Sequence, residues 1–350
     1  MRYLLLPILL LSSCRQDKNT AEETQSNEPT SMRIESERPL MGTLFRIITY
    51  AKDPQEGYLA MEKSFDLAED FSNRATDYDP DSELNRLTKS KPGIPIAVSK
   101  ELFDVLILAK KLTEESEGLF DPTLGPLTHL WRETRRTKEV PSEEAIAAAR
   151  SRCGIGFLAF DEKKQTVTVK RQGLQLDLGG IAKGYAADLI YDHLAKKGFT
   201  QTLVAAAGDL RIGDAPPERE GWNIGLRTFR LTPNKSLPLR NCAVSTSGDL
   251  FQNVTAGGKF YSHLIDLQTG LGLTTRRAAS VIMPEAKMTD PLATAACLSN
   301  NPKALFRKFP EASIRIVYED RKIPSIITGV FTEKIAQNIF LSASPVHAAQ

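Results

Sequence analysis

The chain has 350 residues, of which 41% are hydrophobic and 25% are charged, with 45 Lys and Arg against 43 Asp and Glu. This composition is typical of a globular protein with a sizeable core and excludes a fibrous or wholly disordered chain. The formal net charge of +2 creates no overall field toward nucleic acid, so we expect no nucleic-acid partner. Any phosphate binding must therefore come from a local site.

The first residues resemble the leader of a bacterial lipoprotein. A basic start is followed by the apolar run Tyr3–Leu11, which is too short to span a bilayer, and then by small residues before Cys14. We expect a signal peptide over residues 1–13, lipidation of Cys14 (palmitate among the attached groups), and export to a bacterial membrane with the protein facing the periplasm. An ordinary secretory signal that happens to contain a cysteine is the alternative.

The next segment, residues 14–36, is rich in Glu, Thr, Ser, Asn and Gln. It cannot bury enough apolar surface to fold, so we expect a disordered tether behind the lipidated cysteine. No Pro-, Gly- or Ser-rich linker interrupts the chain after it. We therefore expect one domain over residues 37–343, followed by a C-terminal tail over residues 344–350.

The three remaining cysteines lie far apart and show neither a CxxC spacing nor a neighbouring histidine cluster. A zinc site is therefore not expected. The apolar or small-residue context of each predicts a buried thiol, at Cys153, Cys242 and Cys297.

Hydrophobic spacing predicts the elements in chain order. Apolar residues at intervals of three to four predict helices over residues 54–71, 99–116, 141–152, 181–197 and 291–298. Apolar and β-branched runs bounded by turn residues predict strands over residues 44–50, 167–169, 174–178, 203–207, 222–226, 242–245, 279–283, 313–318 and 325–331. Because helices and strands do not alternate strictly, we expect a mixed α/β (α+β) fold, a single body of largely antiparallel sheets with flanking helices.

The strongest chemical signal is the segment Asp177–Tyr185, with the sequence D-L-G-G-I-A-K-G-Y. An apolar run meets two glycines and then a small-residue helix that carries Lys183. The N–H groups and the dipole at such a helix N-terminus favour an anion. No Ser or Thr follows Lys183, so this is not a Walker motif. We expect a phosphate-binding turn of another kind.

A second candidate site involves Asp290 and Thr294. Asp290 precedes Pro291, so we expect it to cap a helix, with Thr294 one turn further on the same face. A carboxylate and a hydroxyl placed in this way can share one hard cation with a phosphate. A capped helix with an incidental threonine is the alternative that the sequence leaves open.

Three other segments offer polar groups. Ser245–Gly248 presents hydroxyls that suit a phosphate or the edge of a polar ring, or it is an ordinary turn. His263 precedes an apolar strand and can act as a general acid or base, donate to a phosphate, or pin the turn. Two prolines stiffen Phe120–Leu127, which is either a recognition loop or a corner between helices.

In chain order, these motifs resemble those of the ApbE family, the FAD:protein FMN transferases. The resemblance covers about residues 38–331 and agrees with the leader, because many members are lipoproteins. The matching segments are Met41–Thr43, Asp79–Leu84, Phe120–Pro126, Asp177–Tyr185, Gly208–Asp209, Ser245–Gly248, His263–Asp266, Thr269–Gly270, and Asp290 with Thr294.

The resemblance implies a transferase that uses FAD as substrate and Mg²⁺ as cofactor. A Thr or Ser hydroxyl of an acceptor flavoprotein, such as a redox-pump subunit, attacks the phosphorus on the FMN side. AMP leaves, and FMN stays attached through a phosphodiester. The family positions imply that Gly180, Asp290 and Thr294 bind the metal and that His263 and Asp290 are catalytic. They imply an FAD site lined by Met41, Tyr78, Leu119, Phe120, Asp121, Asp177, Lys183, Ser247 and His263.

The chain also departs from the family pattern. Ala205–Asp209 lacks one glycine of the usual Asn-Leu-Gly-Gly-Asp, Leu267 replaces a proline, and Pro291 replaces an alanine. The same residues would serve a periplasmic FAD pyrophosphatase, in which water replaces the acceptor hydroxyl. A flavin-binding lipoprotein without turnover is a third alternative. The chain contains no Asp-x-x-Ser/Thr-Gly-Ala-Thr acceptor motif, so we expect it to modify a partner.

Overall fold

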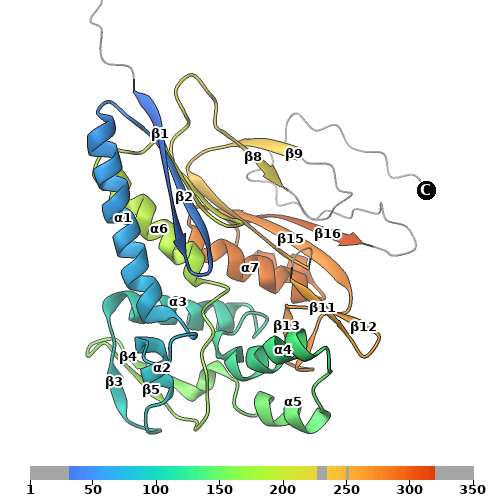
Figure 1. The fold of residues 1–350 in the computed structure, drawn as a ribbon. Helices are drawn as coiled ribbons and strands as arrows, with labels where there is room; N and C mark the ends of the chain where they lie inside the picture. The colour runs from blue at the N-terminus through green and yellow to red at the C-terminus, as the bar shows by residue number, and fades with distance from the viewer. Residues whose placement is uncertain (1–30, 227–234, 250–251, 320–350) are drawn as a thin grey trace, which may run out of the picture. The chain divides into compact units, whose positions relative to one another are not determined.

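The structure is a computed structural model that describes residues 31–226, 235–249 and 252–319. These residues form one body of antiparallel sheets and flanking helices (Figure 1), which confirms the predicted fold class. Within the described part of the chain, no helix is long and apolar enough to cross a bilayer.

The centre of the body is a seven-stranded sheet in which every neighbouring pair is antiparallel. Its strands, in spatial order, are β1 (Met32–Leu40), β2 (Thr43–Ala51), β6 (Thr202–Ala206), β7 (Asp209–Ile212), β10 (Cys242–Gly248), β15 (Arg276–Met283) and β16 (Ser313–Glu319). A two-residue turn joins β1 to β2, and Met41 (φ 50°) and Gly42 (φ 69°) both have the positive φ that a type I′ hairpin requires.

Both faces of this sheet are buried. In β2, Phe45 and Ile47 pack in the main core, whereas Ile48 packs in a second core on the opposite face. Three helices contact the strands on the side of the main core, namely α1 (Pro54–Ala75), α6 (Ala182–Lys196) and α7 (Ala286–Leu298). The hairpin of β8 (Trp222–Leu226) and β9 (Lys235–Leu239) supplies the second core. Burial on both faces explains why β15 carries an unbroken run of buried, mostly apolar residues over its last six positions.

All five helices predicted from apolar spacing are present. Four of them are α1, α6, α3 (Lys100–Glu115) and α5 (Glu143–Arg150), and the fifth lies within α7, which begins earlier than predicted. α1 begins as its sequence indicates, because the Asp53 carboxylate accepts a hydrogen bond from the Gln55 N–H at 2.8 Å and Pro54 occupies the first turn.

Smaller elements complete the body. They are α2 (Glu83–Thr88), α4 (Gly125–Thr137), α8 (Pro302–Arg307), the 3₁₀ turns η1 (Pro122–Leu124) and η2 (Ile155–Phe157), the sheet β3 (Pro95–Ala97), β5 (Thr166–Val169) and β4 (Leu158–Asp161), and the hairpins β11 (Asn253–Ala256) with β12 (Lys259–Ser262) and β13 (Ile265–Asp266) with β14 (Leu271–Gly272). Trp131 joins α4 to the hairpins, since its indole N–H donates to the Gly270 carbonyl at 2.9 Å and its ring lies 4.9 Å from that of Tyr261.

Two predictions about extended segments are wrong. The tether does not extend to residue 36, because β1 begins at Met32 and pairs with β2 along its whole length. Residues 174–178 are extended but form no strand; instead the Asp177 N–H donates to the Pro122 carbonyl at 2.8 Å. The predicted strand over residues 325–331, the C-terminal tail and the leader lie outside the described residues.

The prediction for the cysteines of the body is confirmed, because all three thiols are free and buried. Burial raises the pKa of Cys153 and of Cys242 to about 11 and that of Cys297 to about 12. These thiols therefore stay protonated and unreactive at neutral pH.

Candidate active site

The helix that carries Asp290 and Thr294 starts earlier than its sequence suggests. α7 begins at Ala286, so Asp290 is its fifth residue and not its cap, and Pro291 lies inside the helix. The cap comes from another helix: the Asp188 carboxylate of α6 accepts from the backbone N–H groups of Ala286 and Lys287, each at 2.9 Å. Because these orphan N–H groups are satisfied from α6, α7 needs no cap of its own.

α6 and α7 approach each other very closely at this point. A Cβ atom at Gly184 would lie 2.2 Å from the Ala286 carbonyl oxygen, so only glycine fits there. Arg211 of β7 adds an ion pair to Asp188 at 3.1 Å. Burial nevertheless raises the pKa of Asp188 to about 6, against the opposing effects of the two N–H groups and Arg211.

The packing of α6 on α7 creates what we call the lysine cluster, whose members are Gly179, Lys183, Asp209, Ser247, Asp290 and Thr294. The Lys183 ammonium lies 2.9 Å from the Gly179 carbonyl oxygen, 3.1 Å from Asp209 Oδ2 and 3.4 Å from Asp290 Oδ2. Burial lowers the pKa of Lys183, but the carboxylates of Asp290 and Asp209 outweigh it and raise this pKa above its ordinary value. Lys183 therefore stays positively charged.

Ser247 of β10 connects the two residues of the predicted metal pair, Asp290 and Thr294. The Ser247 hydroxyl donates to Asp290 Oδ1 at 2.8 Å and lies 3.1 Å from the Thr294 hydroxyl. Four of the predicted residues, Lys183, Ser247, Asp290 and Thr294, therefore form one polar group at the meeting point of α6, α7 and β10.

Asp209 was part of a predicted motif but not a predicted site residue. Its side chain is buried at the start of β7. Burial and the negative charge of Asp290 raise the pKa of Asp209 to about 6. Its Oδ2 atom lies 3.1 Å from the Lys183 ammonium, yet within the described part of the chain it makes no hydrogen bond of normal geometry. A buried oxygen in this state has capacity for a further cationic partner.

The oxygens of the lysine cluster fit a hard cation. Among the described residues no three His, Cys, Asp or Glu side chains form a metal-binding group, so a cation would need mixed oxygen ligands. The Asp290 carboxylate and the Ser247 and Thr294 hydroxyls are such ligands, and oxygen is what Mg²⁺ prefers. The carbonyl oxygen within the cluster belongs to Gly179, whereas Gly180 lies beside the ring of Phe120.

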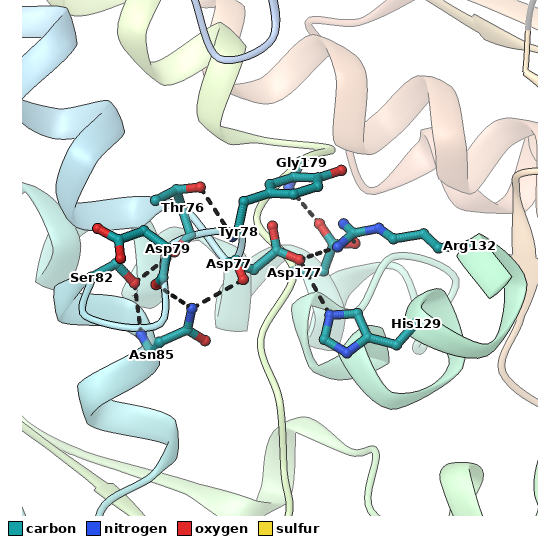
Figure 2. Close-up of polar contacts among 10 residues, drawn as sticks. All are labelled: Thr76, Asp77, Tyr78, Asp79, Ser82, Asn85, His129, Arg132, Asp177 and Gly179. Carbon is teal, nitrogen blue, oxygen red and sulfur yellow. Dashed lines mark hydrogen bonds and ion pairs between the residues drawn. The ribbon is translucent and has the colours of Figure 1, made fainter.

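A second polar group, the arginine cluster, adjoins Gly179 through Asp177 (Figure 2). Its members are Asp77, Tyr78, His129, Arg132 and Asp177. Arg132 donates to the carboxylates of Asp77 and Asp177, and its guanidinium carbon lies 4.5 Å from the centre of the Tyr78 ring. Asp177 Oδ1 accepts from the Gly179 N–H at 2.8 Å. Gly179 therefore joins the two clusters, its N–H to Asp177 and its carbonyl to Lys183.

The other predicted residues of the FAD site are placed separately. Met41 is at the tip of the β1–β2 hairpin, and Phe120 is buried in the main core. The carboxylate of Asp121 is occupied, since it accepts from the N–H and the hydroxyl of Thr123 and so caps η1. Leu119 borders a hollow of about 110 Å³.

His263 lies between β12 and β13, and its hydrogen bond goes to Gln252 and not to the lysine cluster. Its Nδ1 is 3.0 Å from the Gln252 carbonyl oxygen. Because a carbonyl only accepts, Nδ1 carries the proton in the neutral ring and Nε2 keeps a free lone pair. Burial lowers the pKa of His263, and the positive charges of Arg135 and Lys183 lower it further. The imidazole is therefore neutral at pH 7.

Comparison with known proteins gives a consistent result. The model of the ApbE family matches residues 41–311. The FAD:protein FMN transferase of Treponema pallidum (strain Nichols) is 31% identical over 304 residues, which cover 81% of this chain and 84% of the relative. The enzyme of the same name from Vibrio cholerae is 28% identical over 297 residues, which cover 83% of this chain and 84% of the relative.

Solved structures agree with the sequence comparison. The apo form of the flavinyl transferase ApbE from Pseudomonas stutzeri superposes with a TM-score of 0.78 at 25% identity, covering 88% of this chain and 97% of that one. The ApbE protein from Thermotoga maritima gives a TM-score of 0.76 at 28% identity, covering 87% and 99%. With this fold, the lysine cluster and a family match over most of its length, the chain belongs to the ApbE family.

Proposed function

We propose that this protein transfers FMN from FAD to a Thr or Ser hydroxyl of an acceptor flavoprotein. The hydroxyl oxygen forms a bond to the phosphorus on the FMN side, the bond between that phosphorus and the bridging oxygen breaks, and AMP leaves. The observation that carries the proposal is the lysine cluster: one ammonium and a set of hard oxygens meet at the N-terminus of α6. The curated relatives named FAD:protein FMN transferase support the same reaction.

The residues of the lysine cluster would position and neutralise the diphosphate of FAD. Phosphoryl transfer depends mainly on positioning and on neutralisation of charge. The positive charge of Lys183 and the N–H groups at the start of α6 favour an anion there. Asp290 and Thr294, with Ser247 fixing the Asp290 carboxylate, would hold Mg²⁺. When bound, Mg²⁺ supplies charge neutralisation at the diphosphate oxygens.

His263 would take the proton of the acceptor hydroxyl. A neutral ring whose Nδ1 donates to Gln252 has the Nε2 lone pair available as a base. The bond to Gln252 also fixes the orientation of the ring, as a positioned base requires. The lowered pKa of His263 keeps it in the proton-accepting form at neutral pH.

The leader supports an exported, lipid-anchored form of this enzyme. The apolar run and Cys14 would place the lipid at the N-terminus of the mature chain, with the body facing the periplasm. The acceptor would then be a flavoprotein segment on the same side of the membrane, for example in a redox-pump subunit.

The experiment is a transfer assay with the purified chain, FAD, Mg²⁺ and a protein that bears the acceptor motif. We expect the intact mass of the acceptor to increase by one FMN and AMP to appear in equal amount. Free FMN with AMP would instead identify a pyrophosphatase, and unchanged FAD would identify a flavin carrier. Asp290→Ala should abolish transfer with an unchanged circular dichroism spectrum. Asp192→Ala, an exposed change on α6, is the matched control and should be fully active.

A further inference from the structure

We propose that Arg132 is a positioning residue that sets the affinity of this site for FAD by holding Tyr78 and the turn at residues 177–179. The proposal rests on the function proposed above, because it takes FAD as the ligand. Arg132 belongs to α4 and to no motif that the sequence singles out. Its place in the arginine cluster is a consequence of the tertiary fold alone.

The guanidinium of Arg132 contacts three residues from two segments of the chain at once (Figure 2). One terminal nitrogen donates to Asp77, and the other donates to Asp177 Oδ2 at 3.2 Å. Its face lies on the Tyr78 ring at 4.5 Å. Only a planar fork with several donors can make these contacts together, and a lysine ammonium cannot.

Arg132 fixes the orientation of the Tyr78 ring, which the backbone of the turn does not. The backbone of this turn is held by Asn85, whose side-chain N–H group donates to the carbonyls of Asp77 at 3.0 Å and Asp79 at 2.7 Å. The Tyr78 residue itself is 78% exposed. The guanidinium therefore orients a ring that the turn leaves in solvent, and it leaves the opposite face of the ring open to a planar ligand.

The same arginine reaches the lysine cluster through a chain of hydrogen bonds. Arg132 donates to Asp177, the Gly179 N–H donates to Asp177 at 2.8 Å, and the Lys183 ammonium donates to the Gly179 carbonyl at 2.9 Å. The orientation of the 177–179 turn thus depends on Arg132 at one end and on Lys183 at the other.

The positive charge of Arg132 is a second reason to expect that it strengthens FAD binding. The side chains of Asp77 and Asp177 are only 9% and 18% exposed, and Asp177 accepts from the N–H of Gly179, whose carbonyl belongs to the lysine cluster that would take a diphosphate. Without Arg132, the Asp177 carboxylate would lose its cationic partner beside an anionic ligand, with little solvent screening. Loss of Arg132 should therefore weaken binding of FAD. Lys183, Asp290 and Thr294 would keep their own contacts, so the reaction of bound FAD should change much less.

The test compares Arg132→Met and Arg132→Lys with the wild type. We expect Arg132→Met to raise the Kd for FAD, measured by flavin fluorescence, and the KM for FAD by about tenfold or more, with kcat at saturating FAD close to the wild-type value. Arg132→Lys keeps the positive charge but not the planar, multi-donor guanidinium. Its Kd for FAD should therefore lie between those of the wild type and Arg132→Met. Arg136→Met, one turn further on α4, is the matched control and should bind FAD normally, because Arg136 pairs with the exposed Glu133 and not with the arginine cluster among the described residues.

An unchanged Kd in Arg132→Met would overturn the proposal, and so would a loss confined to kcat. If Arg132→Met does not fold, Arg132→Lys decides alone, and a native melting temperature with an unchanged Kd would refute the role. A wild type that binds FAD but transfers no FMN would refute the proposed function, while the Kd comparison would still decide the role of Arg132.

Discussion

Gly184 offers a direct test of how α6 and α7 are held together. In Gly184→Ala, the new methyl group would lie 2.2 Å from the Ala286 carbonyl oxygen and 2.6 Å from its carbon. To reach an ordinary contact the two helices must separate by about 1 Å. Overpacking of this kind costs about 1–3 kcal/mol. Alanine in a helix interior normally stabilises by roughly 1 kcal/mol relative to glycine, so any measured loss understates the clash.

The separation should affect catalysis more than stability. Lys183 precedes Gly184 on α6, and Asp290 follows Ala286 by one turn of α7, so the shift falls on the lysine cluster. A misplacement of about 1 Å can lower a rate by about 100-fold. We expect Gly184→Ala to lose about two orders of magnitude in FMN transfer and a few degrees in Tm. Gly156→Ala, where a Cβ meets nothing within 4 Å, is the control. Wild-type rate and Tm in Gly184→Ala would refute this account of the packing.

Three further predictions follow from single contacts. Ser247→Ala should raise the Mg²⁺ concentration for half-maximal transfer by roughly 10- to 100-fold, whereas Thr246→Ala, whose hydroxyl pairs with a strand neighbour at 2.8 Å, should not; equal behaviour of the two variants would contradict the role of Ser247. Because burial raises the pKa of Asp188 from 3.8 to about 6, the native state holds this proton more tightly than the unfolded state. Its contribution to stability is therefore full below pH 3.8 and lost as the pH rises through about 6. In urea titrations, the unfolding free energy of the wild type should fall over this range relative to Asp188→Asn, and a constant difference would contradict the shift. Trp131→Phe should lose about 1 kcal/mol of unfolding free energy, because the buried Gly270 carbonyl loses its donor at 2.9 Å; an unchanged urea midpoint would contradict that.

The sequence predicts elements well where a single face carries the information. The apolar residues of α1, at Met61, Phe65 and Ala68, recur at helical spacing and all face the main core. The family resemblance, predicted from ordered motifs, is confirmed by the family match, and the fold class, predicted from the mixed order of helices and strands, is confirmed by the solved relatives.

The predictions of secondary structure are wrong where contacts with residues distant in the chain decide the local structure. Leu174, Leu176 and Leu178 alternate as in a strand and are buried, but the segment pairs with no strand of the described residues, and the Asp177 N–H donates instead to Pro122 of a 3₁₀ turn. Because proline favours the first turn of a helix, the sequence predicts that α7 starts at Pro291. In the structure Asp188 of α6 caps the helix at Ala286, and no spacing in the sequence connects these two residues.

The candidate site shows the same division. Lys183, Asp290 and Thr294 lie in recognisable motifs, and the structure brings them together. Arg132 has no such signal, since it lies in the surface-like run Arg132–Arg136 and acquires its partners only through packing of α4. Asp209 was visible as part of a Gly-Asp pair, but its burial beside an ammonium depends on the pairing of β6 with β7.

The ion pair between Lys183 and Asp290 joins residues that are 107 positions apart in the chain. No short fragment of the chain contains both charges. An incomplete or unfolded polypeptide therefore has no functional part of the site. Chemical competence appears only when α6 and α7 have packed against each other. An unfolded chain of this protein would therefore be unable to consume a dinucleotide.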